Sequence, residues 1–296
     1  MNKFFIFLSL YIVVFILYGF VLKPPRLIYN QENLVNINHI NKKHIDGMTI
    51  DDIPEDFKIK IKNYILKLKL TIIEKDNYTI INGTKCPKNL VTQHNKLILG
   101  CDDHIDLMIE IFFLLYIFHE YCESNNIIYS ITYGNLIGYY RENDMLLWDD
   151  DVDLLLMGDK SQIINKLWND SSEEFPIWDN NWTYKNIKLG SYNIILVKMK
   201  TMENFFKIKL NNIIKDYYKD FGGIDITFLI NNIHFGNIDL SILNNYEVNN
   251  ENYPIIKYGP IYTRAFSQNI GTQLLDSYYG KNWNERIHPE LKYELG

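Results

Sequence analysis

The chain is poor in cysteine and has no excess of positive charge, and each shortage excludes a class of protein. Its 296 residues include three cysteines, too few for a disulfide scaffold. The sequence contains no C-x-x-C pair of the kind that would indicate a structural zinc site. The 30 Lys and Arg residues face 36 Asp and Glu residues, so the formal net charge is −6. No basic cluster occurs along the chain, and we therefore expect no nucleic-acid partner.

Local motifs of nucleophilic hydrolases are also missing. The sequence has no G-x-S-x-G elbow, and no local motif suggests a Ser-His-Asp or Cys-His arrangement. His119 falls within an apolar helical pattern, which favours a packed histidine over a catalytic base. Cys122 falls in the same pattern and is interpreted as a buried thiol. In an oxidising compartment Cys86 and Cys101 could pair.

One apolar run is long enough to cross a membrane. It extends from Phe4 to Leu22, about 19 residues, which is the length of a membrane-spanning helix. No small-residue cleavage site precedes its end, so we expect a retained signal anchor over residues 1–26. A cleaved signal peptide is the alternative. Residues 27–60 are polar and mixed and predict a stem, and residues 61–296 predict the catalytic domain.

An acidic run marks the middle of the chain. Four carboxylates fall between Trp148 and Asp153, and the apolar run Val152 to Met157 predicts a buried strand directly behind them. Side chains alternate along a strand, so Asp151 and Asp153 share a face, as does Asp149 if the extended conformation starts early. Acidic runs are often solvated loops. The apolar strand behind this one favours instead a site for Mg²⁺ or Mn²⁺, which prefer oxygen ligands.

The residues just upstream predict a phosphate-binding turn. Ile127 to Tyr133 is β-branched and aromatic, which is typical of a strand. The segment from Gly134 to Gly138 then interrupts the strand, and a strand-to-helix turn presents backbone N–H groups suited to phosphate. Arg141 follows and can offer a planar guanidinium to phosphate oxygens.

Further elements are predicted from apolar periodicity and from glycine positions. The pattern between residues 58 and 73 fits either a helix or a strand. The expected helices and strands are a helix from about His104 to Glu123, a helix at Ser161–Trp168, strands at Tyr184–Leu189 and Ile194–Met199, a strand after Gly222-Gly223, and a helix at Thr272–Tyr279.

Together these segments resemble the LicD/fukutin family. Tyr133 to Arg141 followed by Trp148 to Asp153 is similar to that family's "GG-S/T-LLG-x-x-R" and "WD-x-D-x-D" motifs. The helix Ile105–Glu123 precedes the motif where the family has one. Gly223–Phe228 resembles the family's later "IDIFP" strand, and Leu274–Pro289 resembles its closing "YG-x-x-W-x-x-P" segment.

The resemblance implies a fold, an activity and a location. The fold is α/β (α+β), a nucleotidyltransferase-like mixed sheet with flanking helices, here preceded by an N-terminal membrane helix. The activity is transfer of a phospho-alcohol, phosphocholine-like or ribitol-phosphate-like, from a CDP-linked donor to a glycan acceptor. With the single N-terminal span, it also implies a single-pass membrane protein whose catalytic domain is lumenal or extracytoplasmic.

The resemblance also implies roles for named residues. Asp151 and Asp153 are expected to hold Mg²⁺ or Mn²⁺, with Asp149 as a further ligand. Asp225 is expected to complete the metal site or accept the acceptor's proton, and so to lie within about 8 Å of Asp151 or Asp153. The donor phosphates are expected to contact Gly134, Asn135, Gly138 and Arg141.

The sequence departs from the family pattern in the glycine segment. Tyr133 stands where the family has its first glycine, and Asn135 stands where it has serine or threonine. Two alternatives therefore stay open. One is a glycosyltransferase whose D-x-D motif binds a nucleotide sugar, and the other is a catalytically inactive surface or glycan-binding protein with the same fold.

Overall fold

The computed structural model describes most of the chain after residue 46. The described residues are 47–68, 71–81, 83–87, 102–146, 149, 151–158, 163–170, 174–177, 182–199, 205–210, 223–228 and 240–286. The predicted anchor, most of the predicted stem, Trp148, Asp150 and Cys101 lie outside them. Within the described residues, no helix is both long and apolar enough to cross a membrane.

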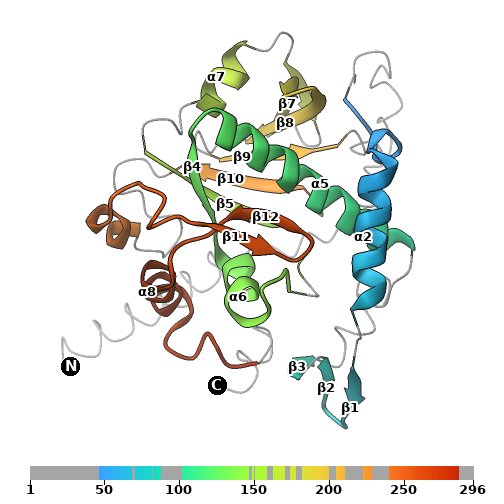
Figure 1. The fold of residues 1–296 in the computed structure, drawn as a ribbon, viewed down its shortest axis with the longest axis vertical. Coiled ribbons are helices and arrows are strands. Elements are labelled where there is room, and N and C mark those ends of the chain that lie inside the picture. The colour runs from blue at the N-terminus through green and yellow to red at the C-terminus, as the bar shows by residue number, and fades with distance from the viewer. Residues whose placement is uncertain are drawn as a thin grey trace, which may run out of the picture. The chain divides into compact units, whose positions relative to one another are not determined.

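A mixed sheet forms the centre of the fold (Figure 1). Its described strands pair side by side, with β5 and β10 parallel and every other neighbouring pair antiparallel. In spatial order the strands are β4 (Ile128–Ile131), β5 (Val152–Met157), β10 (Ile224–Phe228), β9 (Phe205–Lys209), β8 (Tyr192–Met199), β7 (Trp182–Leu189) and β6 (Phe175–Ile177).

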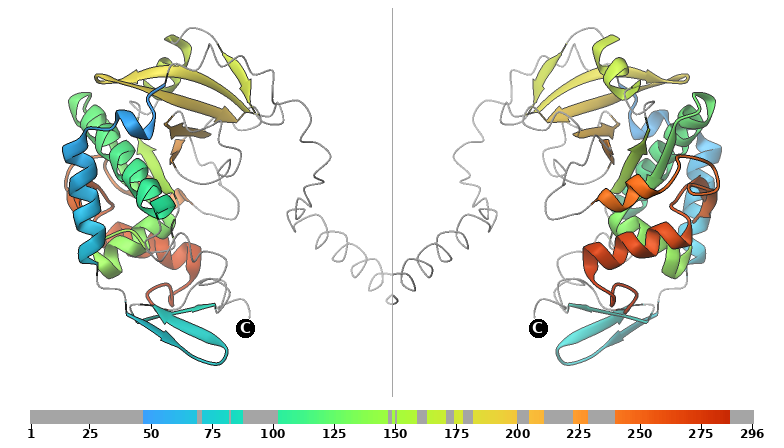
Figure 2. Two further views of the ribbon diagram at one scale, coloured as in Figure 1. Left: turned by 90° about the vertical axis from the view of Figure 1, so that its right-hand side faces the viewer. Right: turned by 90° about the vertical axis from the view of Figure 1, so that its left-hand side faces the viewer.

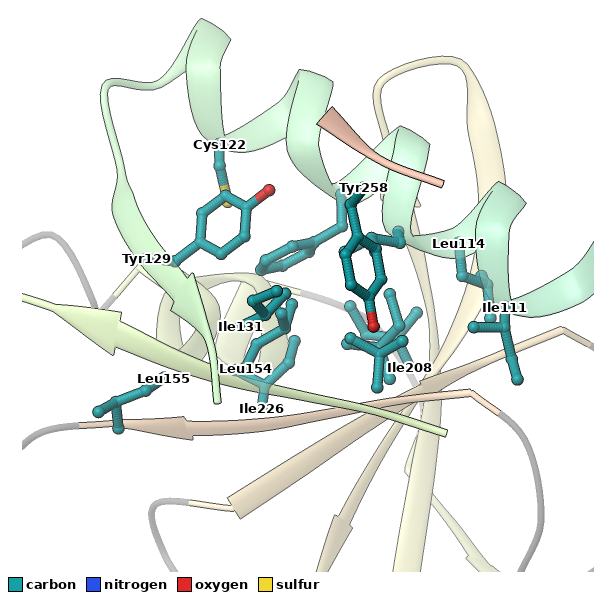
Figure 3. Packing of buried hydrophobic residues seen from close by; sticks show 14 of the residues in the cluster. Ile111, Leu114, Cys122, Tyr129, Ile131, Leu154, Leu155, Ile208, Ile226 and Tyr258 are labelled. Atoms are coloured by element: carbon teal, nitrogen blue, oxygen red, sulfur yellow. The ribbon is translucent and has the colours of Figure 1, made fainter. Parts of the chain in front are cut away.

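Helix α5 (Asp102–Ser124) lies against one face of this sheet. Figure 3 shows Ile131, Leu154, Ile226 and Ile208 between α5 and the strands, and all four are buried. The helix is apolar nearly all round because it is covered on several sides. Besides the sheet it contacts α2 (Glu55–Lys67) and β12 (Ile261–Arg264). Figure 2 shows α2 beside α5 on the same side of the sheet.

Residues before position 60 belong to the folded domain, which corrects the predicted boundary of the stem. Ile53 is buried, and the ring of Phe57 packs on Phe113 of α5 at a centroid distance of 5.3 Å. The described residues from 47 onward accordingly fall in one compact unit. The ambiguous pattern around residues 58–73 is a helix followed by a strand. Helix α2 ends at Lys67, and a small antiparallel sheet follows, formed by β1 (Ile72–Glu74), β2 (Tyr78–Ile81) and β3 (Thr84–Pro87).

The interpretation of His119 as a packed residue is confirmed. Its Nδ1 lies 2.9 Å from the hydroxyl of Tyr129, which lies 2.9 Å from the hydroxyl of Thr263 on β12. Burial lowers the pKa of His119, which keeps the ring neutral. One helical turn later, Glu123 accepts two hydrogen bonds from Arg264. These bonds tie α5 to the hairpin of β11 (Ile255–Tyr258) and β12.

The cysteines are buried where they are described. Cys122 is a buried free thiol on α5, as expected. Cys86 on β3 is also a buried free thiol, and burial raises its pKa to about 12. The predicted pairing with Cys101 falls on a residue outside the described part of the chain.

Helices α7 (Ile163–Asp170) and α8 (Gln268–Tyr279), which stops before Gly280, agree with predicted helices. Helix α6 (Tyr133–Glu142) covers the segment expected to be a turn, and the short 3-10 helices η4 (Ile50–Asp52) and η6 (Leu240–Asn245) were not predicted. The expected fold class, a mixed sheet with flanking helices, is therefore confirmed in these residues. The expected N-terminal membrane helix stays a prediction.

Candidate functional site

The acidic residues gather where two parallel strands begin. Strands β5 and β10 pair in register, so that Asp153 and Asp225 lie side by side at the second position of each strand. On the other side of β10, Lys207 of β9 lies directly opposite Asp225. Paired residues of neighbouring strands share a face. These three side chains therefore lie on the face of the sheet opposite α5.

Lys207 joins two of the predicted site acids. Its Nζ lies 2.9 Å from Oδ1 of Asp225 and 3.8 Å from Oδ2 of Asp151. The carboxylates of Asp151 and Asp225 thus lie within the expected distance of about 8 Å of each other, although the two residues are distant in the sequence. The Lys207 side chain is 8% exposed, whereas Asp225 is 16% and Asp151 is 31% exposed. Asp151 is therefore the more accessible of the two carboxylates, and Oδ1 of Asp225 is buried.

The electrostatic environment of Asp225 reflects this arrangement. Burial raises the pKa of its carboxyl, while the positive charge of Lys207 acts in the opposite direction. The negative charge of Asp151 adds to the rise, and Lys209 reduces it. The net shift is upward, which makes Asp225 a better proton acceptor than an ordinary surface aspartate.

Asn135 holds the acidic loop in place. Its side-chain oxygen accepts a hydrogen bond of 2.7 Å from the backbone N–H of Asp153. Its amide nitrogen lies 3.2 Å from the carbonyl oxygen of Asp151 and 3.4 Å from Oδ2 of Asp149. The asparagine amide offers an acceptor oxygen and two N–H donors, whereas a serine or threonine hydroxyl offers an acceptor oxygen and one donor. The departure from the family pattern at this position is therefore compatible with an ordered loop.

Gly134 lies against the first acid of the run. A Cβ atom at Gly134 would be 3.2 Å from both carboxylate oxygens of Asp149, so a larger residue would crowd that side chain. Gly134 is the second residue of α6. The Asp149 carboxylate consequently lies near the N-terminal end of this helix, where backbone N–H groups favour negative charge.

Tyr133 adopts a backbone conformation that favours glycine. Its φ is +48°, in the left-handed region that glycine adopts without cost. Its ring stacks on Tyr278 of α8, with centroids 5.2 Å apart and planes 20° apart. Burial raises the pKa of Tyr133 to about 12, and the nearby Asp153 contributes. The stacked ring thus accompanies a backbone conformation that a tyrosine rarely adopts.

The predicted phosphate-binding turn is helical. The strand ends at Ile131 and α6 begins at Tyr133, so Gly134 and Gly138 both lie within the helix. A Cβ at Gly138 would collide with the carbonyl oxygen of Asp144, which shows that this glycine lets the returning loop pack on the helix. Only Gly134 and Asn135 of the four predicted donor contacts lie beside the acids.

Arg141 lies at the other end of α6. Its guanidinium donates to the backbone carbonyls of Trp283 and Glu285. It follows Gly134 by seven positions of helix, about 10 Å along the axis. A contact between Arg141 and donor phosphate therefore stays a prediction, and the contacts of Arg141 in the described residues anchor the segment after α8.

Comparison with known proteins identifies a family that the segment containing this site matches. Residues 126–227 match the family model described as LicD/FKTN/FKRP, nucleotidyltransferase domain. The matched range contains all four predicted metal-site acids, Asn135 and Lys207. Residues 126–227 form a LicD/fukutin-type domain. The resemblance seen in the sequence is thereby confirmed.

One curated relative extends this result. The chain is 37% identical over 57 residues to the lipopolysaccharide cholinephosphotransferase LicD of Haemophilus influenzae. The alignment covers 19% of this chain and 22% of that protein, so the similarity concerns about a fifth of each.

The LicD-type site fits a divalent cation in the chemistry of its donors. Carboxylate oxygens are the ligands that Mg²⁺ and Mn²⁺ prefer, and Asp151, Asp153 and Asp225 supply them on one face. Within the described residues, however, no three His, Cys, Asp or Glu side chains already converge tightly enough to hold a metal ion. Lys207 accounts for part of this spacing, because it lies between Asp151 and Asp225.

Two residues of the LicD-type site were not singled out in the sequence. Lys207 belongs to the run Phe205–Lys209, in which two lysines alternate with apolar residues. This alternation could have indicated a buried strand with lysines on one face. Tyr278 carries no such signal, because its contact with Tyr133 joins α8 to α6, which are far apart in the sequence.

Proposed function

We propose that this chain transfers a phospho-alcohol, phosphocholine-like or ribitol-phosphate-like, from a CDP-activated donor to a glycan hydroxyl. The observation that carries the proposal is the pairing of Asp153 and Asp225 at the start of two parallel strands within a LicD-type domain. The similarity to a cholinephosphotransferase supports the same class of reaction.

The proposed chemistry assigns a role to each acid. The acceptor hydroxyl attacks the phosphorus that carries the alcohol, the bond to the CMP oxygen breaks, and CMP leaves with the electron pair. Asp225 accepts the hydroxyl proton, which its partly buried position and raised pKa favour. Asp151 and Asp153 would hold Mg²⁺ or Mn²⁺, with Asp149 as a further ligand. Such an ion, when bound, supplies positive charge opposite the donor diphosphate.

The proposal includes a location. The apolar run from Phe4 to Leu22 supports a single-pass anchor with the LicD-type domain in a lumenal or extracytoplasmic compartment, where glycans are modified. Carbonate extraction of membranes from cells expressing the full chain tests this part. The anchor predicts retention in the pellet, and recovery in the soluble fraction would remove it from the proposal.

A donor screen tests the reaction. The full chain in detergent is incubated with CDP-choline, CDP-ribitol or a panel of nucleotide sugars, with a glycan acceptor and with Mg²⁺, Mn²⁺ or EDTA. We expect release of CMP that depends on acceptor and metal, and that is lost in Asp225→Asn. Asp51→Asn, an exposed carboxylate on η4 outside the site, is the matched control.

The screen also separates the alternatives. Release of UDP or GDP from a nucleotide sugar would favour the D-x-D glycosyltransferase. Absence of turnover with every donor, together with binding of a glycan, would favour the inactive glycan-binding protein.

A further inference from the structure

The lysine between the site acids has no role in the proposed reaction, and its surroundings are unusual. Lys207 comes from β9, and only 8% of its side chain is exposed. Its Nζ lies 2.9 Å from Oδ1 of Asp225 and 3.8 Å from Oδ2 of Asp151. Enclosing an ammonium group is unfavourable unless opposite charges surround it, and these two carboxylates provide them.

We propose that Lys207 is an internal counter-ion that closes the Asp225 side of the acid cluster to metal ions. The reason is competition for the same oxygens. Mg²⁺ binds a carboxylate oxygen at about 2.1 Å, so an ion on Oδ1 of Asp225 would lie within about 5 Å of the ammonium. Like charges at this distance repel strongly in a partly buried site.

The lysine consequently divides the cluster into two parts. The part formed by Asp151 and Asp153 takes the divalent cation, and the part formed by Asp225 and Lys207 does not. Asp225 is then left to accept the proton of the acceptor rather than to bind metal. Lys209, two residues further along the same strand face, adds positive charge to the same side. This inference rests on the proposed function, because that function supplies the divalent cation that one part of the cluster binds.

Counting bound Mn²⁺ tests the inference directly. Purified full-length chain is titrated with Mn²⁺, and free ion is followed by electron paramagnetic resonance. We expect Lys207→Met to bind one more Mn²⁺ per chain than the unmodified protein, and its first ion to bind on the order of 10-fold more tightly. Lys207→Arg keeps the charge and should match the unmodified protein.

A second buried lysine provides the matched control. Lys185 of β7 is buried as well, but its ammonium donates to the carbonyl of Trp168 and lies over that indole ring. Lys185→Met should leave the number of bound ions unchanged. If Lys207→Met does not fold, as judged by circular dichroism, Lys207→Gln keeps a hydrogen-bond donor without the charge and should show the same gain.

The outcomes separate this inference from the proposed function. An equal number of ions in Lys207→Met and in the unmodified protein, at unchanged affinity, would overturn the role of Lys207 and leave the proposed reaction standing. A gain of one ion in the variant, with none bound to the unmodified protein, would support Lys207 as counter-ion and contradict the metal dependence of the proposed reaction.

Discussion

The two faces of strands β5, β10 and β9 differ in the polarity and charge of their side chains. On the face toward α5, Leu154, Ile226 and Ile208 are almost fully buried. On the other face, Asp153, Asp225 and Lys207 form a charged row across the same strands. Because side chains alternate along a strand, burial of one face fixes the direction of the other. The apolar face thus holds the charged face in register.

The comparison predicts different consequences for the two faces. Substitutions on the apolar face should reduce stability, because they leave cavities under α5. Removal of Asp153 on the charged face should leave the fold intact, because the acids repel one another. Removal of Asp225 should cost more, because it takes the nearest carboxylate from the buried Lys207 ammonium.

The largest effect is expected from the acids themselves. Asp151→Ala and Asp153→Ala should each reduce CMP release by roughly 100-fold or more, because each removes a proposed metal ligand. Thermal melting should change little in either variant. Retained turnover in both, or turnover that survives EDTA in the unmodified protein, would contradict the assignment of these acids.

The apolar face should respond in stability. Ile226→Ala should lower the free energy of unfolding by about 2–5 kcal/mol, because Ile226 is completely buried beneath α5. Thr227→Ala alters the next residue, which lies on the charged face, and should cost less than about 1 kcal/mol. Urea denaturation of the two variants makes the comparison, and equal losses would show that the faces are not distinct.

The partly buried carboxyl of Asp144, beside helix α2, should make stability depend on pH. Asp144 accepts a hydrogen bond from the Tyr64 hydroxyl of α2, and burial raises its pKa to about 7. The native state therefore binds a proton more tightly than the unfolded state. This stabilises the fold at pH 4 and below, and the stabilisation is lost as pH rises through about 7.

Asp144→Asn should remove this dependence. The amide can still accept the bond from Tyr64, and it carries no charge at any pH. Relative to the unmodified protein, the variant should gain roughly 2–4 kcal/mol of stability between pH 4 and pH 8. Urea midpoints at several pH values measure the gain, and a constant difference between the two proteins would count against the raised pKa.

The smallest effect concerns the backbone at Tyr133. Both Tyr133→Gly and Tyr133→Ala lose the stack on Tyr278, but only glycine relieves the positive φ. Tyr133→Gly should therefore be the more stable of the two by about 1 kcal/mol. At exposed Lys62 of α2 the order should reverse, since glycine weakens an ordinary helical position. The same order at both positions would show that Tyr133 is not strained.

Much of the fold could be predicted because its signals are local. The apolar run behind the acids is β5, the apolar helical pattern is α5, and the glycine pair precedes β10. A local signal is less decisive where it has two physical causes. The glycines between residues 134 and 138 indicated a phosphate-binding turn, which stays a prediction, but Gly138 also lets the loop at Asp144 pack against helix α6. A glycine required for close packing and a glycine required for ligand binding cannot be distinguished in the sequence.

The sequence by itself determined the alternation that puts Asp151 and Asp153 on one face, because this depends only on the two-residue period of a strand. Tertiary structure decided which other residues share that face. Asp225 and Lys207 reach it because β10 pairs with β5 on one side and with β9 on the other. Strand pairing joins segments that are distant along the chain, and no local pattern of residues specifies the neighbour.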